Sequence, residues 1–466
     1  MAMTRDTRPV SADVRESMTT VEEYLRHDGG APDVLFERST KDHGTAPLSK
    51  ECYVSAAWAD LEMDKLWKRV WQMACRENDI PAVGDFVEYV IGTQSVIVVR
   101  DAPDSIKALQ NSCRHRGTAL VQGCGSRQEL ECTFHGWTWN LDGSLKRIPC
   151  RWDFPDVTDE ACRLPECRVA TWNGFVFINF DPDAPSLEEY LGEAVPRHFE
   201  RWPLAQRWKA VHVVKPVPAN WKVAFEAFIE DYHVFRTHPQ IVPYAGDCNS
   251  QYDIFDDLHG RMITAMGVAS PHAGDQYSYQ DTVDAMIGDL IADVVREQGV
   301  EVPIPQVPEG GTSRQVLAEF MRQSVGQRSG VDLSGLSDAE ALDAIEYHVF
   351  PNLIPWGGFS FPLVYRYRPA GRDPNWCLFD IMIFVPFPEG AEMPKDAPPV
   401  LLPAEGPFSD CAELGPLGPV YDQDMVNMTR VQKGLQNDGL TEVNFAQYQE
   451  MNIRNFHANL SRYVEK

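Results

Sequence analysis

Two short cysteine–histidine motifs, Cys113-x-His115 and Cys132-x-x-His135, constrain the fold of this chain more than any other feature. Sixteen residues separate the motifs, and each motif lies in a loop between runs of strand-forming residues. Thiolate and imidazole groups are common transition-metal ligands in proteins, and the glycines around both motifs permit tight turns. We therefore expect two facing loops that bring the four side chains together at a metal centre.

Two kinds of metal centre accept these four side chains. A Rieske [2Fe–2S] cluster takes two thiolates on one iron and two neutral imidazoles on the other, whereas a structural zinc ion can take all four groups. Zinc motifs usually pair like residues, as in Cys-x-x-Cys, but each motif here holds one cysteine and one histidine. The mixed pairs favour the iron–sulfur cluster, with each loop contributing one ligand to each iron.

The segment around the motifs also resembles a known family. The runs NSCRHRG, CTFHGWTWNLDGSL and NGFVFINF resemble the Rieske domain of ring-hydroxylating oxygenases over residues 50–180. Within it, residues 113–151 hold six basic side chains against three acidic ones, a local charge of +3. We hypothesise that this basic patch docks an acidic electron donor, with a structural role for the arginines around His115 as the alternative.

Charge and composition exclude several classes of function. The 466 residues include 42 Lys and Arg against 68 Asp and Glu, a net charge of −26. Such a chain repels phosphate backbones and anionic lipid, so nucleic acid and membranes are not expected partners. No apolar run reaches the roughly 18–20 residues needed to span a bilayer, and the first residues lack a signal-peptide core. With 11 scattered cysteines, the sequence predicts a cytoplasmic protein with reduced thiols.

The chain is long enough for two or three domains. Residues 1–50 are expected to form an N-terminal arm or short helices, and residues 51–180 a leading helix and an all-β domain. Residues 181–466 mix strand and helix patterns, which predicts an α+β domain with an antiparallel sheet. Within it, residues 247–345 are expected to form a loop and helix insert. Helices are expected at 53–72, 219–238, 420–436 and 441–463, and a strand meander at 346–386.

A second candidate metal site lies in the run NWKVAFEAFIEDYHVFRTHPQ, residues 220–240. His233 and His238 are five residues apart, which on an ideal helix separates them by about 140°. Pro239 disfavours a helical conformation at His238, so we expect His233 on a helix and His238 at its unwound end. Two histidines and one carboxylate form the facial triad of non-haem Fe(II) oxygenases, which leaves open positions for dioxygen and substrate.

The carboxylate of such a triad has three candidates near the C-terminus: Asp422, Asp424 and Asp438. Asp424 shares one face of the expected helix with apolar residues, and Asp422 lies on roughly the opposite side. A lone carboxylate on an apolar face is costly unless something pairs it. A metal would pair Asp424, and a salt bridge is the alternative. The apolar residues of that face are Met428, Val431 and Leu435.

The resemblance to ring-hydroxylating oxygenases covers nearly the whole chain, apart from residues 1–50 and 247–345. It implies a Rieske domain followed by a helix-grip-like (START-like) catalytic domain. It also implies that His233, His238 and Asp424 bind a mononuclear Fe(II), because the 220–240 run and the carboxylate before the V-Q-x-G-L run resemble the family's ligand segments.

The family's electron path is described as crossing between neighbouring subunits of a homotrimer. A carboxylate three residues before the first histidine ligand connects that histidine to a cluster histidine of the next chain. This position holds Glu230, as in the branch that resembles choline, betaine and carnitine oxygenases, and Asp231 is the second choice. Many relatives carry Asn after the glutamate at 226, but this chain has Ala227, so the branch does not identify the substrate.

The resemblance implies an oxygenase that uses O₂ and electrons from NAD(P)H, delivered by a ferredoxin or flavin reductase. The expected reaction is hydroxylation or dihydroxylation of a small aromatic substrate. Oxidative N- or O-demethylation of a quaternary amine or aryl ether is an alternative. A non-catalytic Rieske electron carrier and a zinc-stabilised binding module are alternatives from other classes. The substrate pocket is expected near Phe225, Phe228 and Ile229, with Trp356 and Phe359 as candidate contacts.

Overall fold

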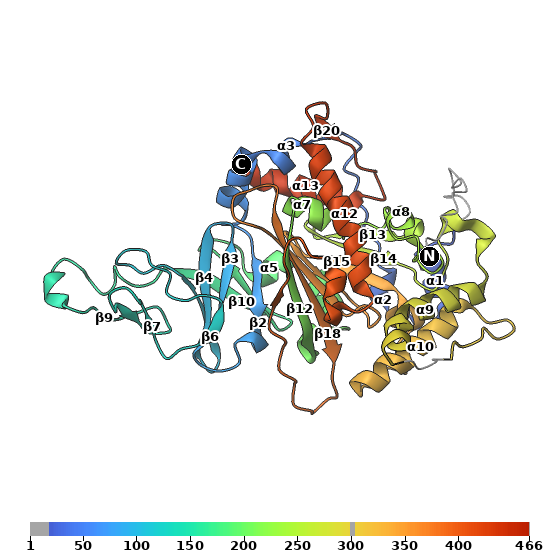
Figure 1. Ribbon diagram of the computed structural model, residues 1–466, viewed down its shortest axis with the longest axis horizontal. Coiled ribbons are helices and arrows are strands. Elements are labelled where there is room, and N and C mark those ends of the chain that lie inside the picture. Colours follow the sequence, from blue (N-terminus) through green and yellow to red (C-terminus); the bar gives the residue numbers. More distant parts are fainter. Residues whose placement is uncertain (1–17, 299–302, 466) are drawn as a thin grey trace.

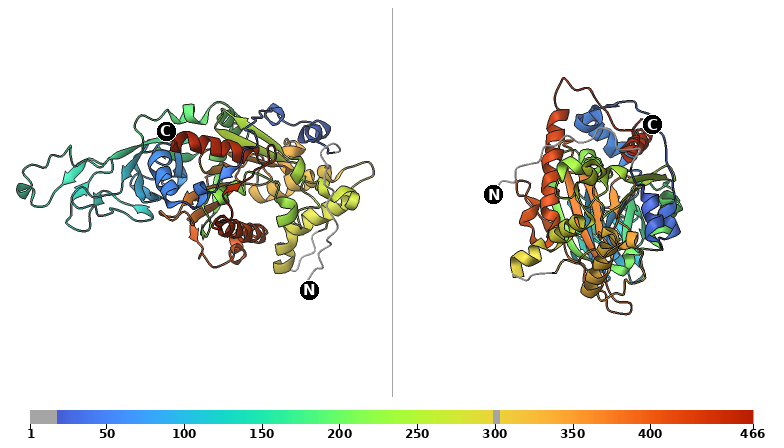
Figure 2. Two further views of the ribbon diagram at one scale, coloured as in Figure 1. Left: turned by 90° about the horizontal axis from the view of Figure 1, so that it is seen from above. Right: turned by 90° about the vertical axis from the view of Figure 1, so that its right-hand side faces the viewer.

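A computed structural model of the chain describes residues 18–298 and 303–465. The molecule is elongated, with a β-rich domain at one end, a central sheet, and a helical region at the other end (Figures 1 and 2). No helix within the described residues is long and apolar enough to cross a bilayer.

The β-rich domain is built from short strands joined by turns, as the sequence predicts. Its main sheet has seven strands in the order β2-β11-β10-β5-β4-β3-β6, and a second sheet of three, β7-β8-β9, extends beyond it. The strands are β2 (Gln72–Arg76), β3 (Asp85–Ile91), β4 (Gln94–Ala102), β5 (Ser105–Gln110), β6 (Cys124–Ser126), β7 (Leu130–Glu131), β8 (Thr138–Trp139), β9 (Leu145–Arg147), β10 (Glu166–Trp172) and β11 (Phe175–Asn179).

The second domain combines antiparallel sheets with helices. Five strands follow the order β16-β17-β18-β12-β19, in which only the short β19 pairs in parallel, and three more form the sheet β13-β14-β15. These strands are β12 (Arg207–Val217), β13 (Gln251–Phe255), β14 (His259–Thr264), β15 (Ala344–His348), β16 (Leu353–Pro355), β17 (Leu363–Pro369), β18 (Cys377–Pro386) and β19 (Val400–Leu401). The structure confirms an α+β fold.

Helices cover this sheet and close one end of the molecule. Helix α7 packs on β17 and β18, and α12 packs on α7 and α8, while α9 and α10 pack on each other at the far end (Figure 1). The main helices are α7 (Trp221–Glu226), α8 (Val234–Thr237), α9 (Tyr279–Gln298), α10 (Ser313–Ser329), α12 (Leu417–Leu435) and α13 (Met451–Val464). The shorter ones are α1 (Val21–Asp28), α2 (Asp33–Phe36), α3 (Glu51–Val54), α4 (Ala56–Leu61), α5 (Leu187–Leu191), α6 (Ala194–Phe199) and α11 (Asp338–Leu342).

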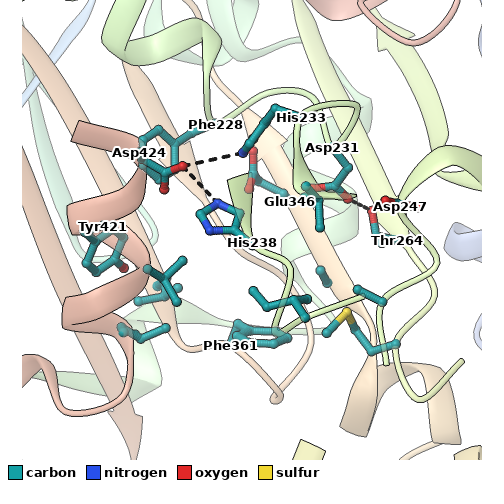
Figure 3. A pocket seen from close by; sticks show the side chains of 18 of the residues that line it. Phe228, Asp231, His233, His238, Asp247, Thr264, Glu346, Phe361, Tyr421 and Asp424 are labelled. Carbon is teal, nitrogen blue, oxygen red and sulfur yellow. Dashed lines mark hydrogen bonds and ion pairs between the residues drawn. The ribbon is translucent and has the colours of Figure 1, made fainter. Parts of the chain in front are cut away.

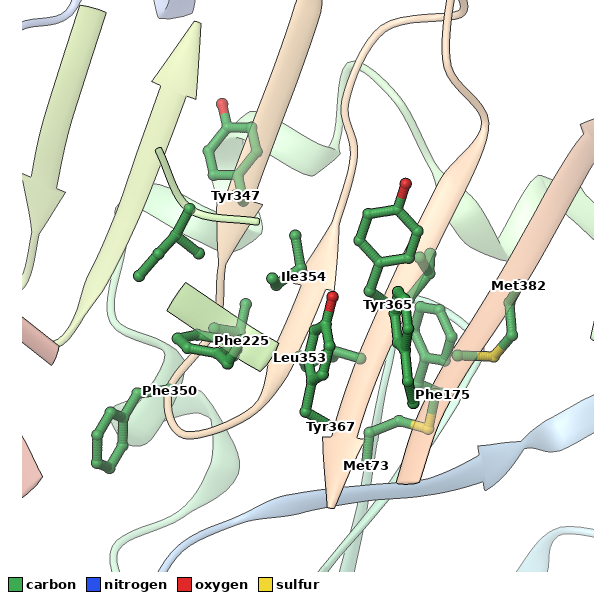
Figure 4. Close-up of a cluster of buried hydrophobic side chains, with 14 of the residues drawn as sticks. Met73, Phe175, Phe225, Tyr347, Phe350, Leu353, Ile354, Tyr365, Tyr367 and Met382 are labelled. Atoms are coloured by element: carbon green, nitrogen blue, oxygen red, sulfur yellow. The ribbon is translucent and has the colours of Figure 1, made fainter. Parts of the chain in front are cut away.

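The two domains share one hydrophobic core. Met73 and Phe175 of the β domain lie beside Tyr365 and Met382 of the second domain, and all four belong to the same buried cluster (Figure 4). Because burial of such side chains contributes about 1.5–3 kcal/mol each, the junction holds the domains in a fixed relation rather than as units on a flexible linker.

A buried ion network fixes the same junction. Asp380 on β18 accepts hydrogen bonds from Arg366 (2.8 Å) and Arg368 (3.0 Å) on β17. Arg366 also donates to the main-chain oxygen of Met73 (3.0 Å), and Arg368 to that of Val90 (3.0 Å). The carboxylate thus balances two guanidinium groups that reach from the second domain into the β domain.

Several elements differ from the sequence prediction. The single helix expected at 53–72 is divided into α3, α4 and a π-helical turn at Glu62–Leu66. Ser55 separates α3 from α4, because its hydroxyl caps α4 by accepting from the main-chain N–H of Trp58. The helix expected at 441–463 begins only at Met451, since β20 (Glu442–Val443) pairs with β1 (Leu48–Ser49).

The expected insert at 247–345 contains two strands that the sequence did not reveal. β13 and β14 are buried along their whole length, but they carry charged side chains that break the apolar pattern. Asp253 on β13 and Arg261 on β14 form an ion pair at 2.7 Å. Burial of this pair is tolerated because each charge has its partner, a relation that hydrophobic periodicity cannot indicate. The limits predicted for the domains and for the insert stay predictions.

Candidate functional site

The two cysteine–histidine loops are built in the same way. The main-chain oxygen of Cys113 accepts from the N–H of Gly117 (2.8 Å), and that of Cys132 accepts from the N–H of Gly136 (2.9 Å). Both glycines have positive φ, +81° and +71°, a conformation that glycine adopts without strain. The equal construction places one cysteine and one histidine on each of two facing turns, as the motif spacing predicts.

The four side chains of these loops converge. Nδ1 of His115 and Nδ1 of His135 lie 3.1 Å apart, and the buried side chains of Cys113 and Cys132 contact each other. Burial and the neighbouring His135 and Arg116 lower the pKa of His115, which favours the neutral imidazole that binds metal. Two thiols and two neutral imidazoles are the donor set of a Rieske cluster, so the residues present fit that group.

Two aromatic residues that the motif does not include complete this centre. The ring of Trp137 stacks on His115 with centroids 5.0 Å apart and planes 7° apart, and Phe154 meets His115 edge-on at 5.8 Å. Trp137 is visible in the sequence only as part of the family resemblance, and Phe154 has no local signal at all. Both rings cover one side of His115.

The outer side of the cluster loops is exposed. Phe134 is 56% exposed and Trp152 80%, and the guanidinium of Arg116 lies 5.0 Å from the Phe134 ring. The basic patch is partly neutralised, since half of its six basic side chains form ion pairs. The pairs are Lys146–Glu129 (2.6 Å), Arg147–Glu131 (3.6 Å) and Arg151–Asp159 (2.9 Å).

A second group of converging ligands lies in the other domain (Figure 3). Oδ1 of Asp424 is 2.9 Å from Nε2 of His238 and 3.6 Å from Nε2 of His233. The three ligand atoms all lie within 4.8 Å of one another, so they could hold one metal ion. Two imidazoles and one carboxylate are the donor set of a non-haem iron facial triad, and the residues fit it.

The backbone reaches this geometry differently from the expected helix. Helix α7 ends at Glu226, and His233 precedes the short α8 rather than lying on a longer helix. His238 ends α8 with φ −120° and ψ 63°, outside the helical region, as the following proline predicts. The short α8 thus presents one histidine at each of its ends.

Each histidine is oriented by an acceptor on its other nitrogen. Oε1 of Glu230 accepts from Nδ1 of His233 (2.6 Å), while Oε2 accepts from the His233 main-chain N–H (3.0 Å). Oε1 of Gln423 accepts from Nδ1 of His238 (2.7 Å). Such contacts fix the tautomer so that Nε2 faces the metal. Sequence reasoning missed Gln423, although its position next to Asp424 on α12 was a usable signal.

The other acidic residues considered in the sequence analysis do not contact the two histidines. Asp231 accepts from the hydroxyls of Thr264 and Ser250 rather than from His233. Asp422 accepts from main-chain N–H groups at the turn before α12, and Asp438 is exposed.

The predicted apolar face of α12 is partly wrong. Met428 and Leu435 are buried beside Asp424, but Val431 is 50% exposed. Gln432 takes the buried position instead, because its side-chain oxygen accepts from the main-chain N–H of Asn220 at 2.9 Å.

A cavity of about 390 Å³ opens beside the triad. Phe228 and Trp356 line it, as the sequence suggests. Phe225, Ile229 and Phe359 do not belong to its lining; Phe359 instead packs under the guanidinium of Arg207 at 4.5 Å. The apolar wall also includes Val234, Ile241, Met262, Met266, Met286, Leu290, Phe361, Leu363, Tyr365, Val420 and Tyr421.

The cavity also has an acidic side that sequence reasoning missed. Asp247, Asp289 and Glu346 line it together with Asp231. Burial raises the pKa of Asp231 to about 6 and that of Glu346 well above its ordinary value, with neighbouring carboxylates adding to the latter shift. These residues come from separate parts of the chain, so no local motif connects them.

Comparison with known proteins identifies two domains in the chain. The model of the Rieske [2Fe-2S] domain matches residues 70–158, and the model of the ring hydroxylating alpha subunit (catalytic domain) matches residues 199–466. The biphenyl 2,3-dioxygenase subunit alpha of Rhodococcus jostii (strain RHA1) is 32% identical over 209 residues, 42% of this chain and 44% of that protein. The anthranilate 1,2-dioxygenase large subunit of Acinetobacter baylyi (strain ATCC 33305 / BD413 / ADP1) is 31% identical over 205 residues, 42% of this chain and 43% of that protein. The matched segments thus span less than half of these relatives.

Solved structures share the fold over nearly the whole chain. A quaternary ammonium Rieske monooxygenase in complex with L-carnitine has a TM-score of 0.62 at 18% identity, covering 91% of this chain and 96% of that one. A naphthalene 1,2-dioxygenase with bound indole has a TM-score of 0.62 at 19% identity, covering 92% of this chain and 94% of that one. The catalytic-domain match alone covers more than half of the chain, so this protein belongs to the ring-hydroxylating α-subunit family, with a Rieske [2Fe–2S] domain ahead of its catalytic domain.

Proposed function

We propose that this chain is the catalytic α subunit of an oxygenase that hydroxylates or dihydroxylates a small aromatic substrate with O₂. The observation that carries the proposal is the group His233, His238 and Asp424 at the wall of a cavity of about 390 Å³. When bound, the mononuclear iron supplies O₂ activation, and the Rieske cluster supplies electrons one at a time. The Rieske domain carries the cluster, and the catalytic domain of this family binds the mononuclear iron.

The protein's own side chains have three tasks in this proposal. Cys113, Cys132, His115 and His135 would hold the cluster, with the histidines at the exposed end of the domain. The facial triad would hold the iron and leave positions open towards the cavity. The apolar lining excludes water from the reacting atoms, which limits loss of oxidising equivalents to solvent.

The route of electrons into the iron site is proposed to cross between two copies of this chain. Figure 1 places the cluster loops near β7 and β9 at one end of the molecule, and α8 and α12 on the other side of the central sheet. Glu230 already accepts from His233, and its location makes it the proposed link to His135 of a neighbouring copy. A homotrimer, fed by NAD(P)H through a ferredoxin or flavin reductase, would satisfy this arrangement.

A second candidate function is oxidative N- or O-demethylation. The acidic side of the cavity favours N-demethylation of a cationic amine over attack on an uncharged hydrocarbon, because an ionised carboxyl group pairs with a cation. The solved monooxygenase with L-carnitine shows that the same fold can bind a quaternary ammonium compound.

The proposal is tested with purified, iron-loaded protein, a generic ferredoxin and its reductase. We expect about three irons per chain and O₂ consumption that depends on one member of a panel of aromatic compounds, with oxygenated product in equal amount. The variant Asp424→Ala should keep the cluster spectrum and lose turnover. A cluster that is reduced and reoxidised without any substrate-dependent O₂ uptake would favour the electron-carrier alternative, and a colourless protein the zinc-stabilised module.

A further inference from the structure

The cavity holds more carboxyl groups than the metal site explains. Beyond the iron ligands and Glu230, four carboxyl groups line it, and none of the lining residues in the described chain is Lys or Arg. Two of them, Asp247 and Glu346, are buried, and buried carboxylates normally have a cationic partner, because an unpaired charge is costly in a low-dielectric site. The four are Asp231, Asp247, Asp289 and Glu346.

Three of these carboxyl groups are held by hydroxyls. Asp289 accepts from Tyr244 (2.8 Å), Asp247 accepts from Ser270 (2.7 Å), and Asp231 accepts from Thr264. A hydroxyl satisfies an acceptor but carries no charge. These contacts orient the carboxyl groups and supply no counter-charge to any of them.

Glu346 lacks even that support. Its side chain on β15 is only 3% exposed, it lines the cavity, and its Oε1 has no hydrogen-bond partner among the described residues. Figure 3 shows the carboxylate on the cavity wall between His238 and Asp231. A buried acceptor left without a donor costs about 1–3 kcal/mol, so this side chain indicates a donor that arrives with a ligand.

The Trp356 ring is the aromatic group next to the Glu346 carboxylate. Glu346 pairs with Trp356 across an antiparallel bridge, and residues directly opposite in such a pair point their side chains to the same face. The centroid of the Trp356 ring lies 5.4 Å from that of Phe361 and 6.1 Å from that of Tyr365, and all three residues line the cavity. A carboxylate next to aromatic faces is a favourable environment for an organic ammonium ion.

We propose that the substrate of the oxygenase function above is a protonated amine on an apolar, aromatic frame, and that Glu346 binds its ammonium group beside Trp356. The remaining carboxyl groups add to the negative potential that draws the cation in. The frame lies along the apolar wall towards the triad, so the oxidised carbon belongs to the apolar part or to the carbon next to nitrogen. Carboxylate substrates are excluded by the same charge.

The test compares three probes of one shape that differ in charge. Binding of 1-naphthylmethylamine, 1-naphthylmethanol and 1-naphthoate to the iron-loaded protein is measured by anaerobic calorimetry, with benzylamine, benzyl alcohol and benzoate as a smaller series. A hydrogen bond to a charged group is worth about tenfold or more in affinity. We expect the amine to bind about tenfold more tightly than the alcohol in at least one series, and the carboxylate to show no binding.

Variants assign that preference to one side chain. Glu346→Gln keeps the shape but cannot ionise beside a bound ammonium group, so amine and alcohol should bind with equal affinity, while Glu346→Asp should keep the preference. Glu389→Gln, at an exposed position, removes the same charge from the surface and should change nothing.

Three results would overturn the proposal. The first is equal binding of amine and alcohol to the wild-type protein, and the second is failure of both amines to bind. The third is an amine preference that survives in Glu346→Gln. Because calorimetry does not depend on turnover, an amine that binds through Glu346 without O₂ consumption would instead count against the proposed oxygenase function.

Discussion

The contact between Glu230 and His233 gives the sharpest test of the proposed electron route. One carboxylate accepts two hydrogen bonds from the same residue, at 2.6 Å from Nδ1 and 3.0 Å from the main-chain N–H. Glu230→Gln keeps the shape of the side chain but replaces one acceptor by an NH₂ group. That group would face one of the two N–H donors, so one of the two bonds must be lost.

The size of the effect follows from these contacts. A hydrogen bond to a charged group contributes about 1.5–3 kcal/mol, and loss of an acceptor that orients a metal-bound histidine typically costs about 10–100-fold in metal affinity or activity. The iron should therefore stay bound when Fe(II) is supplied in excess. The larger loss is expected in electron transfer, because the NH₂ group of the amide cannot accept a hydrogen bond. The side chain can then no longer hold His233 and also accept from a cluster histidine of the neighbouring copy.

Single-turnover kinetics measure that loss directly. The reduced protein is mixed with O₂ and substrate, and reoxidation of the cluster is followed by its visible absorbance. We expect reoxidation in Glu230→Gln to slow by about tenfold or more, with cluster and iron contents close to those of the wild type. Glu188→Gln, an exposed position on α5, should behave as the wild type. Wild-type rates in Glu230→Gln with both metals present would refute the assignment of Glu230 as the link.

Three further predictions address the metal site, the domain junction and pH. Asp424→Ala should lose the mononuclear iron and keep the cluster, which iron analysis and the visible spectrum would show; retention of all iron would contradict its role as a ligand. Asp380→Asn should destabilise the protein by about 3–5 kcal/mol, because it leaves Arg366 and Arg368 buried without a counter-charge; a denaturation midpoint equal to that of the wild type would contradict this. Burial lowers the pKa of His259 from 6.5 to about 4. Since the unfolded chain then binds a proton that the folded chain does not, about 3 kcal/mol of stability should be lost as pH falls from about 6.5 to about 4. His259→Gln should show a smaller loss over that range in the same denaturation assay, and an unchanged loss would argue against His259 as the cause.

The parts of the molecule that the sequence predicts well are those whose residues are close together in the chain. The cluster loops are an example. Cys113 with His115 and Cys132 with His135 each lie within one turn, and the glycine that follows each motif adopts the positive φ that the turn needs. The strands of the β domain follow from the same kind of local pattern. Asp424 could be chosen because an acidic side chain on an apolar helix face is unusual, and this can be seen without knowing which segment packs against that face.

Other features depend on contacts between distant segments, and no local pattern indicates them. The strands β13 and β14 were missed because Asp253 and Arg261 neutralise each other only after the strands pair. The helix expected to carry His233 ends early at Glu226, whose carboxylate accepts from Tyr53 and contacts His457. Both partners come from distant ends of the chain, so the break is a tertiary effect.

The cavity is built partly from residues that are close together in the chain and partly from distant segments. For this reason the sequence predicts the chemistry of the site but not its substrate. Its reactive side comes from α8 and one turn of α12, so the triad could be inferred from two short runs of residues together with the family resemblance. Its selective side joins β14, β15, α9 and the turn at Trp356, so Glu346 has no sequence neighbour that indicates its role. Oxygen chemistry needs a fixed set of metal ligands, whereas substrate choice needs only a carboxyl group at the right place on the cavity wall. The two can therefore vary independently within one fold, and in this chain the carboxylate at 346 is where that choice is proposed to lie.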